Sequence, residues 1–271
     1  MFNLLKGEIY KLWRSKSLYI CSAVMLVFVL LLYGMFSLAD MMQQGEVANG
    51  SYGLTVNEGV TSVWDEMGIP YIVQMMFSSI SALIVAIFVS IYVFGDYANG
   101  AIKNVVGKGY SRGTVFLSKF VGTVVGTAVM QIVMVLGLLI CEVIILGGRR
   151  LNVDVLVEIS GYVAMQLLLG AALTAIVVTI SQVCRNLGAG IAISACMIMF
   201  SSFATAGINA LLKFMDMNVN VCEYWILDLI SECPMGNMDN SFLVRAVVCA
   251  IVWSVVAIGV GAIHFRKADV K

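Results

Sequence analysis

The sequence predicts an all-α, polytopic membrane protein with six transmembrane helices. Its 271 residues are 61% hydrophobic and 12% charged, with a mean hydropathy of +0.98, whereas soluble domains carry about 25% charged residues. Apolar runs of roughly 20 residues are long enough to cross a bilayer as helices. These runs are continuous, unlike the alternating segments of about ten residues in a membrane β-barrel. The expected spans are 18–38, 70–94, 120–146, 163–180, 188–212 and 242–263.

Residues 1–17 predict an amphipathic helix that lies in the membrane interface. At about 100° per residue, its apolar side chains share roughly a third of the helical wheel, and charged side chains lie opposite. The apolar set is Phe2, Leu5, Ile9, Leu12 and Trp13, and the charged set is Glu8, Lys11 and Arg14. Tyr10 and Trp13 suit the depth of the lipid headgroups. An ordinary basic flank is the open alternative.

The first apolar run, 18–38, is expected to remain in the mature protein. Ser37-Leu38-Ala39 resembles the small-residue cleavage site of a signal peptide. The apolar stretch of about 20 residues is nevertheless longer than a signal-peptide core of roughly 7 to 15 residues.

The distribution of basic residues predicts that both termini are cytoplasmic. With the N-terminus inside, 12 of the 16 Lys and Arg residues fall on the cytoplasmic side, as the positive-inside rule requires. Arg149 and Arg150 oppose this assignment, and Asp154 and Glu158 follow closely enough to offset their charge. A re-entrant third segment is the alternative explanation.

Two outer segments connect the spans. Residues 40–69 predict a long acidic loop without Lys or Arg, and Pro70 is suited to begin the second helix. Residues 213–241 predict a structured loop, because apolar side chains between Tyr224 and Ile230 cover most of a helical wheel. We expect a short helix there that dips into the outer face of the membrane.

Cys222 and Cys233 flank this short helix in a segment expected on the oxidising side. A straight helix of eleven residues would separate its ends by roughly 16 Å, whereas a disulfide needs Cα atoms about 4.4 to 6.8 Å apart. A disulfide would therefore require a hairpin. The alternative is a pair of free, partly buried thiols.

A few polar residues lie inside the predicted spans. Gln131, Gln166 and Glu142 are candidates for an intramembrane polar lining, although Gln side chains also hold helices together. Glu142 lies near an outer end, so a snorkelling or water-facing carboxylate is the alternative. Gly122 and Gly126 allow close helix packing, within the chain or between two chains.

The sequence lacks the motifs of an enzyme. His264 is the single histidine, so a His-Glu-x-x-His metal site is absent. Ala101 follows Gly95 to Gly100 where a phosphate-binding loop needs lysine. We therefore expect no catalytic site, metal or cofactor in this chain, and no nucleic-acid partner.

The polar stretch 96–119 interrupts the apolar sequence and predicts a contact surface on the cytoplasmic side. Its apolar positions Ile102, Val105 and Val106 lie opposite Lys103 and Asn104 on a short helix, which the following glycines end. The alternative is a basic loop attracted to anionic headgroups.

The order of a leader, six spans, Asp96-Tyr-x-Asn-Gly-x-Ile-Lys-Asn, Gly109-Tyr-Ser-Arg and Leu117-Ser-Lys119 resembles the permease subunits of ABC-2 type exporters. It is most similar to the small permeases of lantibiotic immunity, bacitracin resistance and related peptide-export systems. The resemblance covers nearly the whole chain, which would be a single transmembrane domain, 1–271. Its specific signal lies in residues 96–119.

The resemblance implies that 96–119 contains a coupling helix between the second and third spans, with residues 100–108 docked into a separate ATPase. The leader would be the connecting helix beside it. The implied docking residues are Asp96, Tyr97, Asn99, Gly100, Ile102, Lys103, Asn104, Lys108, Gly109, Ser111 and Arg112. Such permeases often carry glutamate at the position of Asp96. They also have short membrane-dipping helices between the fifth and sixth spans.

The resemblance further implies an ATP-driven exporter in a bacterial cytoplasmic membrane. ATP and Mg would bind the ATPase subunit, and a second permease, identical or related, would complete the pathway within membrane lipid. The expected cargo is an amphipathic or antimicrobial peptide or a lipid-like molecule. The alternatives are a carrier driven by an ion gradient and a sensor or scaffold that transports nothing.

Overall fold

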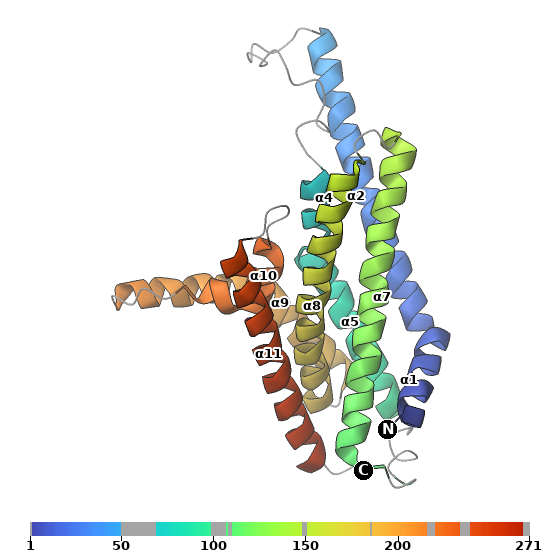
Figure 1. Ribbon diagram of the computed structural model, residues 1–271, viewed down its shortest axis with the longest axis vertical. Helices are drawn as coiled ribbons and strands as arrows, with labels where there is room; N and C mark the ends of the chain where they lie inside the picture. The colour runs from blue at the N-terminus through green and yellow to red at the C-terminus, as the bar shows by residue number, and fades with distance from the viewer. Residues whose placement is uncertain are drawn as a thin grey trace.

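The structure is a computed structural model, and it describes residues 2–49, 69–98, 107, 110–147, 151–184, 186–215, 220–233 and 239–267. These residues form helices joined by short connections, without a β-strand among them. Six of the helices are long and apolar enough to cross a membrane (Figure 1). The predicted all-α fold with six membrane-spanning helices is therefore confirmed.

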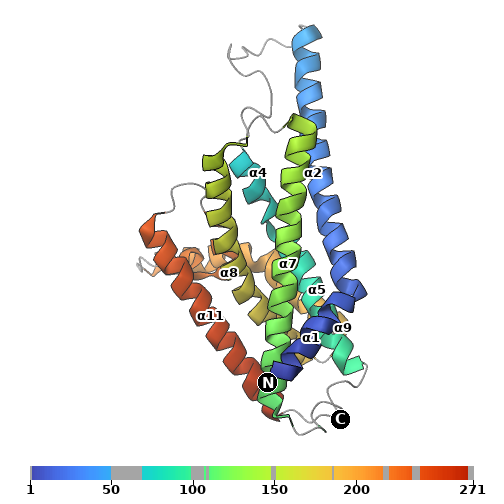
Figure 2. The same ribbon diagram turned by 45° about the vertical axis from the view of Figure 1, so that its right-hand side comes forward.

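The leader forms α1, Phe2–Arg14, which crosses the N-terminal part of α7, Arg112–Leu146 (Figure 2). Leu12 is buried, whereas Trp13, which belongs to the same apolar set, is exposed, as is Tyr10. The Glu8 side chain of the charged set is only 13% exposed, so burial in α1 does not simply follow its apolar face. After α1, the amide of Ser15 donates to the carbonyl oxygen of Leu12 at 3.1 Å, and its hydroxyl donates to the same oxygen at 2.8 Å. The chain then turns into the first long helix.

This first long helix, α2, is Lys16–Asn49 and contains 34 residues. It continues past the expected end at residue 38 and measures about 51 Å at 1.5 Å per residue. The residues after 38 include several strong helix formers and no proline, so the helix extends into the segment expected to be a loop. The remainder of that loop, 50–68, lies outside the described residues.

The second predicted span, 70–94, is divided into α4, Ile69–Met76, and α5, Ser79–Ala98. At the break, the hydroxyl of Ser81 donates to the carbonyl oxygen of Ser78 at 2.8 Å, which satisfies a carbonyl inside the membrane. The neighbouring Phe77 ring packs edge-on against Tyr162, with the ring centroids 5.6 Å apart. Hydropathy alone does not reveal this break, because the residues around it are mostly apolar.

The other helices also extend past the apolar runs that predicted them. Their bounds are α8, Val153–Cys184; α9, Leu187–Phe214; η1, Val221–Tyr224; α10, Ile226–Glu232; and α11, Asn240–Lys267. Capping groups set several of the ends. Ser111 caps the start of α7 and Asn186 the start of α9, and Gly147 ends α7 with a φ of 66° that favours glycine.

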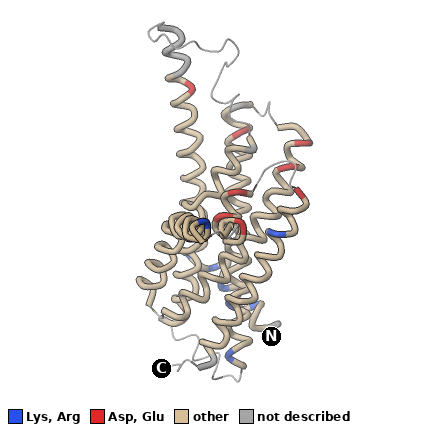
Figure 3. The backbone as a smooth tube through the Cα atoms, turned by 90° about the vertical axis from the view of Figure 1, so that its left-hand side faces the viewer, with Lys and Arg blue, Asp and Glu red and all other residues tan. Residues whose placement is uncertain are grey.

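Helix α8 is central in the bundle and packs against α5, α7, α9 and α11. The helices α2, α5, α7, α8 and α11 follow the long axis of the molecule, whereas α9 lies across it and points away from the bundle (Figure 1). Figure 3, turned by 90°, shows α9 end-on. The molecule is therefore a bundle around α8 with one transverse arm.

Candidate functional site

A cluster of charged and polar side chains joins three helices at the two ends of the stretch 96–119. It consists of Glu8 and Lys11 from α1, Tyr92 and Asp96 from α5, and Lys119 from α7, and we call it the basal ion cluster. Lys11 pairs with Oδ1 of Asp96 and Lys119 pairs with Oδ2. Each carboxylate oxygen of Asp96 thus has a lysine from a different helix.

Glu8 completes the cluster from the other side. Its Oε1 lies 3.4 Å from Nζ of Lys119, and its Oε2 accepts a hydrogen bond from the hydroxyl of Tyr92 at 3.0 Å. The Tyr92 hydroxyl also lies 3.2 Å from the carbonyl oxygen of Glu8. Lys11 Nζ lies 5.4 Å from the centroid of the Tyr92 ring. The leader is therefore attached to α5 and α7 by several polar contacts.

Because several charged groups of this cluster are buried, each needs a partner of opposite charge within the protein. The side chains of Asp96 and Lys119 are 1% and 4% exposed, whereas that of Lys11 is 41% exposed. Removing one partner of a buried ion pair leaves an uncompensated charge and typically costs about 3–5 kcal/mol. Burial lowers the pKa of Lys11, and the neighbouring Glu8 carboxylate raises it. Its carboxylate partners therefore help to keep Lys11 charged.

Two glycines of α7 allow the leader and α5 to approach. A Cβ atom at Gly126 would lie 2.7 Å from Cζ of Phe88 on α5 and 3.0 Å from Cδ1 of Leu12 on α1. A Cβ atom at Gly122 would lie 3.6 Å from Cβ of Glu8. The close-packing interpretation of this glycine pair is confirmed, and the glycine face is occupied by helices of the same chain.

The structure describes part of the predicted docking segment. Asp96 and Tyr97 lie near the end of α5, and Ser111 and Arg112 lie at the start of α7, where Ser111 Oγ accepts a hydrogen bond from the Thr114 amide at 3.3 Å. The predicted docking residues outside the described ranges are Asn99, Gly100, Ile102, Lys103, Asn104, Lys108 and Gly109. The structure therefore places the two ends of this segment.

Sequence reasoning did not find the partners of Asp96. The sequence predicts Glu8 and Lys11 on the polar face of an interfacial helix. It places Lys119 in a motif but does not predict which residue Lys119 contacts. The spacing of Glu8 and Lys11, three residues apart on one helix face, was the available signal. It indicates a paired surface but does not identify the helix that covers it.

The three polar residues predicted to line a pathway, Gln131, Gln166 and Glu142, are all buried. Gln131 borders a cavity of about 10 Å³ beside Gly170. Gln166 is 1% exposed, and its Nε2 donates to the hydroxyl of Tyr162 at 2.8 Å and to the carbonyl oxygen of Ile230 at 2.9 Å. The cavity beside Gln131 is large enough for about one water molecule. Ile230, whose carbonyl binds Gln166, also lines the cavity beside Gln131, whereas Glu142 pairs with Tyr33.

Glu142 differs from the expectation of a snorkelling or water-facing carboxylate. Its side chain is fully buried between α7 and α2, and Oε2 accepts a hydrogen bond from the hydroxyl of Tyr33 at 3.0 Å. The interaction is possible because α2 runs beside α7 over much of its length (Figure 2). The partner is more than 100 positions away in sequence, so local patterns do not reveal it.

The segment 221–233, which we call the outer cap, dips into the bundle as η1 and α10. Ile226 and Leu229 of α10 are fully buried. Several neighbouring helices hold the cap by polar contacts. These contacts are Gln74 Nε2 to the Ser231 carbonyl at 3.3 Å, Gln166 to the Ile230 carbonyl, Trp253 Nε1 to the Tyr224 carbonyl at 3.0 Å, the Val221 amide to Asn209 Oδ1 at 2.7 Å, and an ion pair of Arg245 with Glu223.

Cys222 and Cys233 are free thiols in the structure. Cys222 is half-buried and its Sγ lies 2.9 Å from Nδ2 of Asn209. Cys233 is fully buried at the end of the outer cap, and burial raises the pKa of its thiol to about 11. The helical segments η1 and α10 lie between the two cysteines.

Comparison with known proteins agrees with this architecture. Residues 4–201 match the family described as ABC-2 family transporter protein. The matched region runs from α1 into α9 and includes all five residues of the basal ion cluster. A search of curated proteins found no match. Because the family match covers well over half of the sequence, this chain belongs to the ABC-2 transporter family as a multi-pass membrane permease.

Proposed function

We propose that the chain is the permease subunit of an ATP-driven exporter whose coupling segment, 96–119, docks into a separate ATPase. The observation that supports this proposal most is the basal ion cluster. Asp96 at one end of the segment and Lys119 at the other form an ion pair, and both contact α1 through Lys11 and Glu8. A force applied to the segment would therefore move α1, α5 and α7 as one unit.

In this mechanism the ATPase supplies the energy. ATP and Mg bind the ATPase subunits, whose association displaces the coupling segments of two permeases, identical or related. The chain itself has no catalytic role, since its sequence lacks a phosphate-binding loop. Helix α9, which points away from the bundle (Figure 1), gives a second permease a helix to pack against.

The proposed cargo is an amphipathic or antimicrobial peptide, or a lipid-like molecule, as in systems for lantibiotic immunity, bacitracin resistance and peptide export. The cavity beside Gln131 holds about 10 Å³, far less than a peptide needs. Gln166 and Glu142 are engaged with Ile230 and Tyr33. A pathway formed at the surface between two subunits suits these observations better than a channel inside one chain.

We further propose that the chain lies in a bacterial cytoplasmic membrane with both termini in the cytoplasm. The described Lys and Arg residues gather mainly in the half of the molecule that contains α1 (Figure 3). Helix α11 ends in the same half (Figure 1). This charge distribution agrees with the positive-inside rule.

The coupling assignment is tested by reversing two charges, Lys103→Glu and Lys108→Glu, in one variant. An ABC ATPase that co-purifies with the unaltered permease from membranes is measured for the variant, and the permease in the membrane fraction is quantified. We expect loss of the ATPase without loss of membrane insertion. Lys213→Glu, at the exposed end of α9, is the matched control and should retain the ATPase. Normal co-purification of the double variant would refute the assignment.

Export that continues without the ATPase and follows an ion gradient would instead support a secondary carrier. An absence of any transport, with a stable complex of other membrane proteins, would support a scaffold. Both results are read from the same membranes, so they discriminate the three functions directly.

A further inference from the structure

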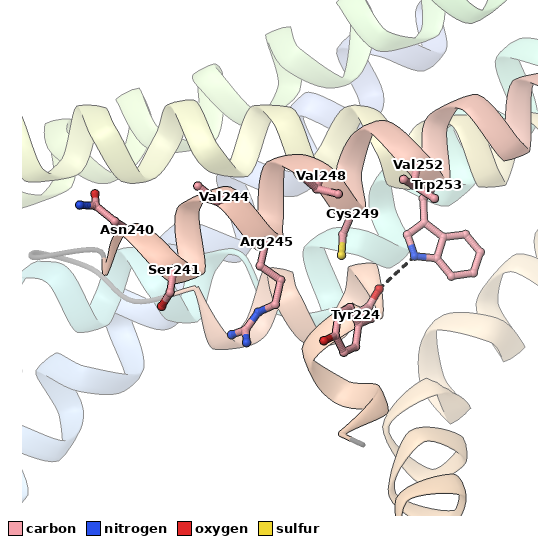
Figure 4. A pocket seen from close by; sticks show the side chains of 9 residues that line it. All are labelled: Tyr224, Asn240, Ser241, Val244, Arg245, Val248, Cys249, Val252 and Trp253. Carbon is pink, nitrogen blue, oxygen red and sulfur yellow. Dashed lines mark hydrogen bonds between the residues drawn. The ribbon is translucent and has the colours of Figure 1, made fainter. Parts of the chain in front are cut away.

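An apolar groove of about 900 Å³ runs along α11 beside η1. Figure 4 shows its lining, in which Arg245, Cys249 and Trp253 of α11 point toward Tyr224. The hydrogen bond from Trp253 Nε1 to the Tyr224 carbonyl closes one side. This groove lies beyond residue 201, where the family match ends.

The polarity of the groove changes along α11. Ser241 and Arg245 lie near the start of the helix, and Val248, Val252 and Trp253 follow deeper in the membrane. From Ser241 to Trp253 the helix rises about 18 Å, close to the thickness of one leaflet, which is about half of a 30 Å hydrocarbon core. A ligand with a polar head and an apolar tail of leaflet length fits this gradient.

Arg245 and Glu223 place opposite charges at the polar end. They form an ion pair, and their side chains are 32% and 36% exposed, so both remain reachable. The ion pair engages Nη1 of Arg245. A guanidinium has five N–H donors and binds phosphate well. The Glu223 carboxylate accepts hydrogen bonds from an ammonium group.

We propose that this groove binds one zwitterionic phospholipid with a primary ammonium headgroup. The phosphate binds Arg245, the ammonium binds Glu223, and an acyl chain lies along Val248 and Val252 toward Trp253. Asp239, which accepts a hydrogen bond from Ser241 at 2.6 Å, adds negative charge near the same end. This charge favours a zwitterionic headgroup over an anionic one. The assignment to the outer leaflet rests on the proposed orientation, whereas the binding site does not.

Bound lipid would affect the outer cap. Glu223 and Tyr224 belong to η1, so the headgroup shares Glu223 with Arg245 at the contact between the cap and α11. A phosphate on Arg245 replaces part of that ion pair and leaves the cap attached to α11 through the Trp253 hydrogen bond. Lipid occupancy and cap position are thereby linked.

Native mass spectrometry of the permease alone tests the site. Delipidated protein is titrated with phosphatidylethanolamine, phosphatidylcholine or phosphatidylglycerol of identical acyl chains. We expect one saturable phosphatidylethanolamine and weaker binding of the other two. Phosphatidylcholine lacks N–H donors for Glu223, and phosphatidylglycerol lacks the cationic group. Because no ATPase is present, failure of the coupling proposal would not alter this result.

Two variants distinguish recognition of the lipid headgroup from binding of the acyl chain. Glu223→Gln with Arg245→Gln removes both charges without leaving one unpaired, and should weaken phosphatidylethanolamine binding about tenfold and abolish the preference among headgroups. Val248→Trp fills the groove and should weaken all three lipids. Ile251→Trp is the matched control, because Ile251 is 54% exposed, Val248 is 51% exposed, and Ile251 does not line the groove.

A photoreactive residue at Val252 identifies the occupant in membranes. Cross-linking to phosphatidylethanolamine supports the proposal. Cross-linking chiefly to a second copy of the chain, unchanged lipid binding by Val248→Trp, or tighter binding of phosphatidylglycerol would each overturn it.

Discussion

Asp96 is a buried carboxylate with one lysine on each oxygen, and these lysines belong to α1 and α7. Lys11 and Lys119 both reach this aspartate. A single side chain thus links the leader, the end of α5 and the start of α7.

Neutralising Asp96 should destabilise the permease. In Asp96→Asn, Lys119 loses one buried partner but keeps Glu8 at 3.4 Å, so we expect a loss at or below the lower end of the ~3–5 kcal/mol that an uncompensated buried charge costs. Adding Lys119→Met should recover part of this loss, because the buried cation is then absent. Thermal unfolding in detergent measures both. Lys213→Met is the control, and strictly additive effects of the two substitutions would contradict the pairing.

The thiol of Cys233 should react slowly and with an unusual pH dependence. Burial raises its pKa to about 11, and the thiolate is the reactive form. In a variant that retains only Cys233, the rate of alkylation by iodoacetamide should reach half of its maximum near pH 11. For an ordinary thiol the half-maximal rate would fall near pH 8.5. Mass spectrometry measures the rate, and a half-maximal rate near pH 8.5 would disprove the effect of burial.

Individual elements are positioned by small residues and by polar side chains. The glycines of α7 let α1 and α5 pack closely, and Gln166 on α8 holds the backbone of α10. The break between α4 and α5 lies at Phe77 and Ser78, at a position where the sequence predicts a continuous span. These contacts determine where each helix lies, whereas hydropathy determines only that a helix spans the membrane.

Gly126→Ala should destabilise the packing of α1 and α5 on α7. Its Cβ would lie 2.7 Å from Cζ of the fully buried Phe88, and overpacking typically costs about 1–3 kcal/mol. Gly259→Ala on α11 is the matched control, since nothing lies within 4 Å of its Cβ position. It should be neutral or stabilising because alanine favours helix. Equal melting temperatures of the two variants would contradict this packing.

Weakening the outer cap should expose Cys233. Gln166→Leu removes the donor to the Ile230 carbonyl while keeping a buried side chain of similar size. In the variant that retains only Cys233, we expect faster alkylation at constant pH. Gln182→Leu, at another buried glutamine sixteen residues further along α8, should not change the rate. An unchanged rate in Gln166→Leu would show that this hydrogen bond does not hold the cap.

On the scale of the whole molecule, the basal ion cluster and the outer cap lie in different parts of the bundle. The basal ion cluster and most described basic residues lie in the half that contains α1 (Figure 3). The outer cap contacts α4, α8, α9 and α11 farther along the bundle. Helix α8 packs directly against α10 of the outer cap, and it reaches the basal ion cluster through its contact with α5. Movement at one end of the bundle can therefore be passed to the other end through packed helices.

The proposed orientation predicts which sites are accessible from outside. In a cysteine-free background, Asp154→Cys should react with a membrane-impermeant maleimide in intact cells, whereas Lys6→Cys should react only after permeabilisation. Both positions are exposed in the structure, so accessibility reports the side of the membrane. The reverse pattern would invert the topology.

Hydropathy and local motifs predict the membrane environment, the number of spans, the amphipathic leader, the dipping segment near residues 224–230 and the family. These follow from apolar runs, helical periodicity and local motifs, which act over a few turns of one chain segment. The packing of the helices was needed to reveal the partners of Asp96, the burial of Glu142 against Tyr33, the break at Phe77 and the transverse direction of α9. These features depend on which helix faces meet, and contacts between distant segments leave no periodic signal in a single sequence.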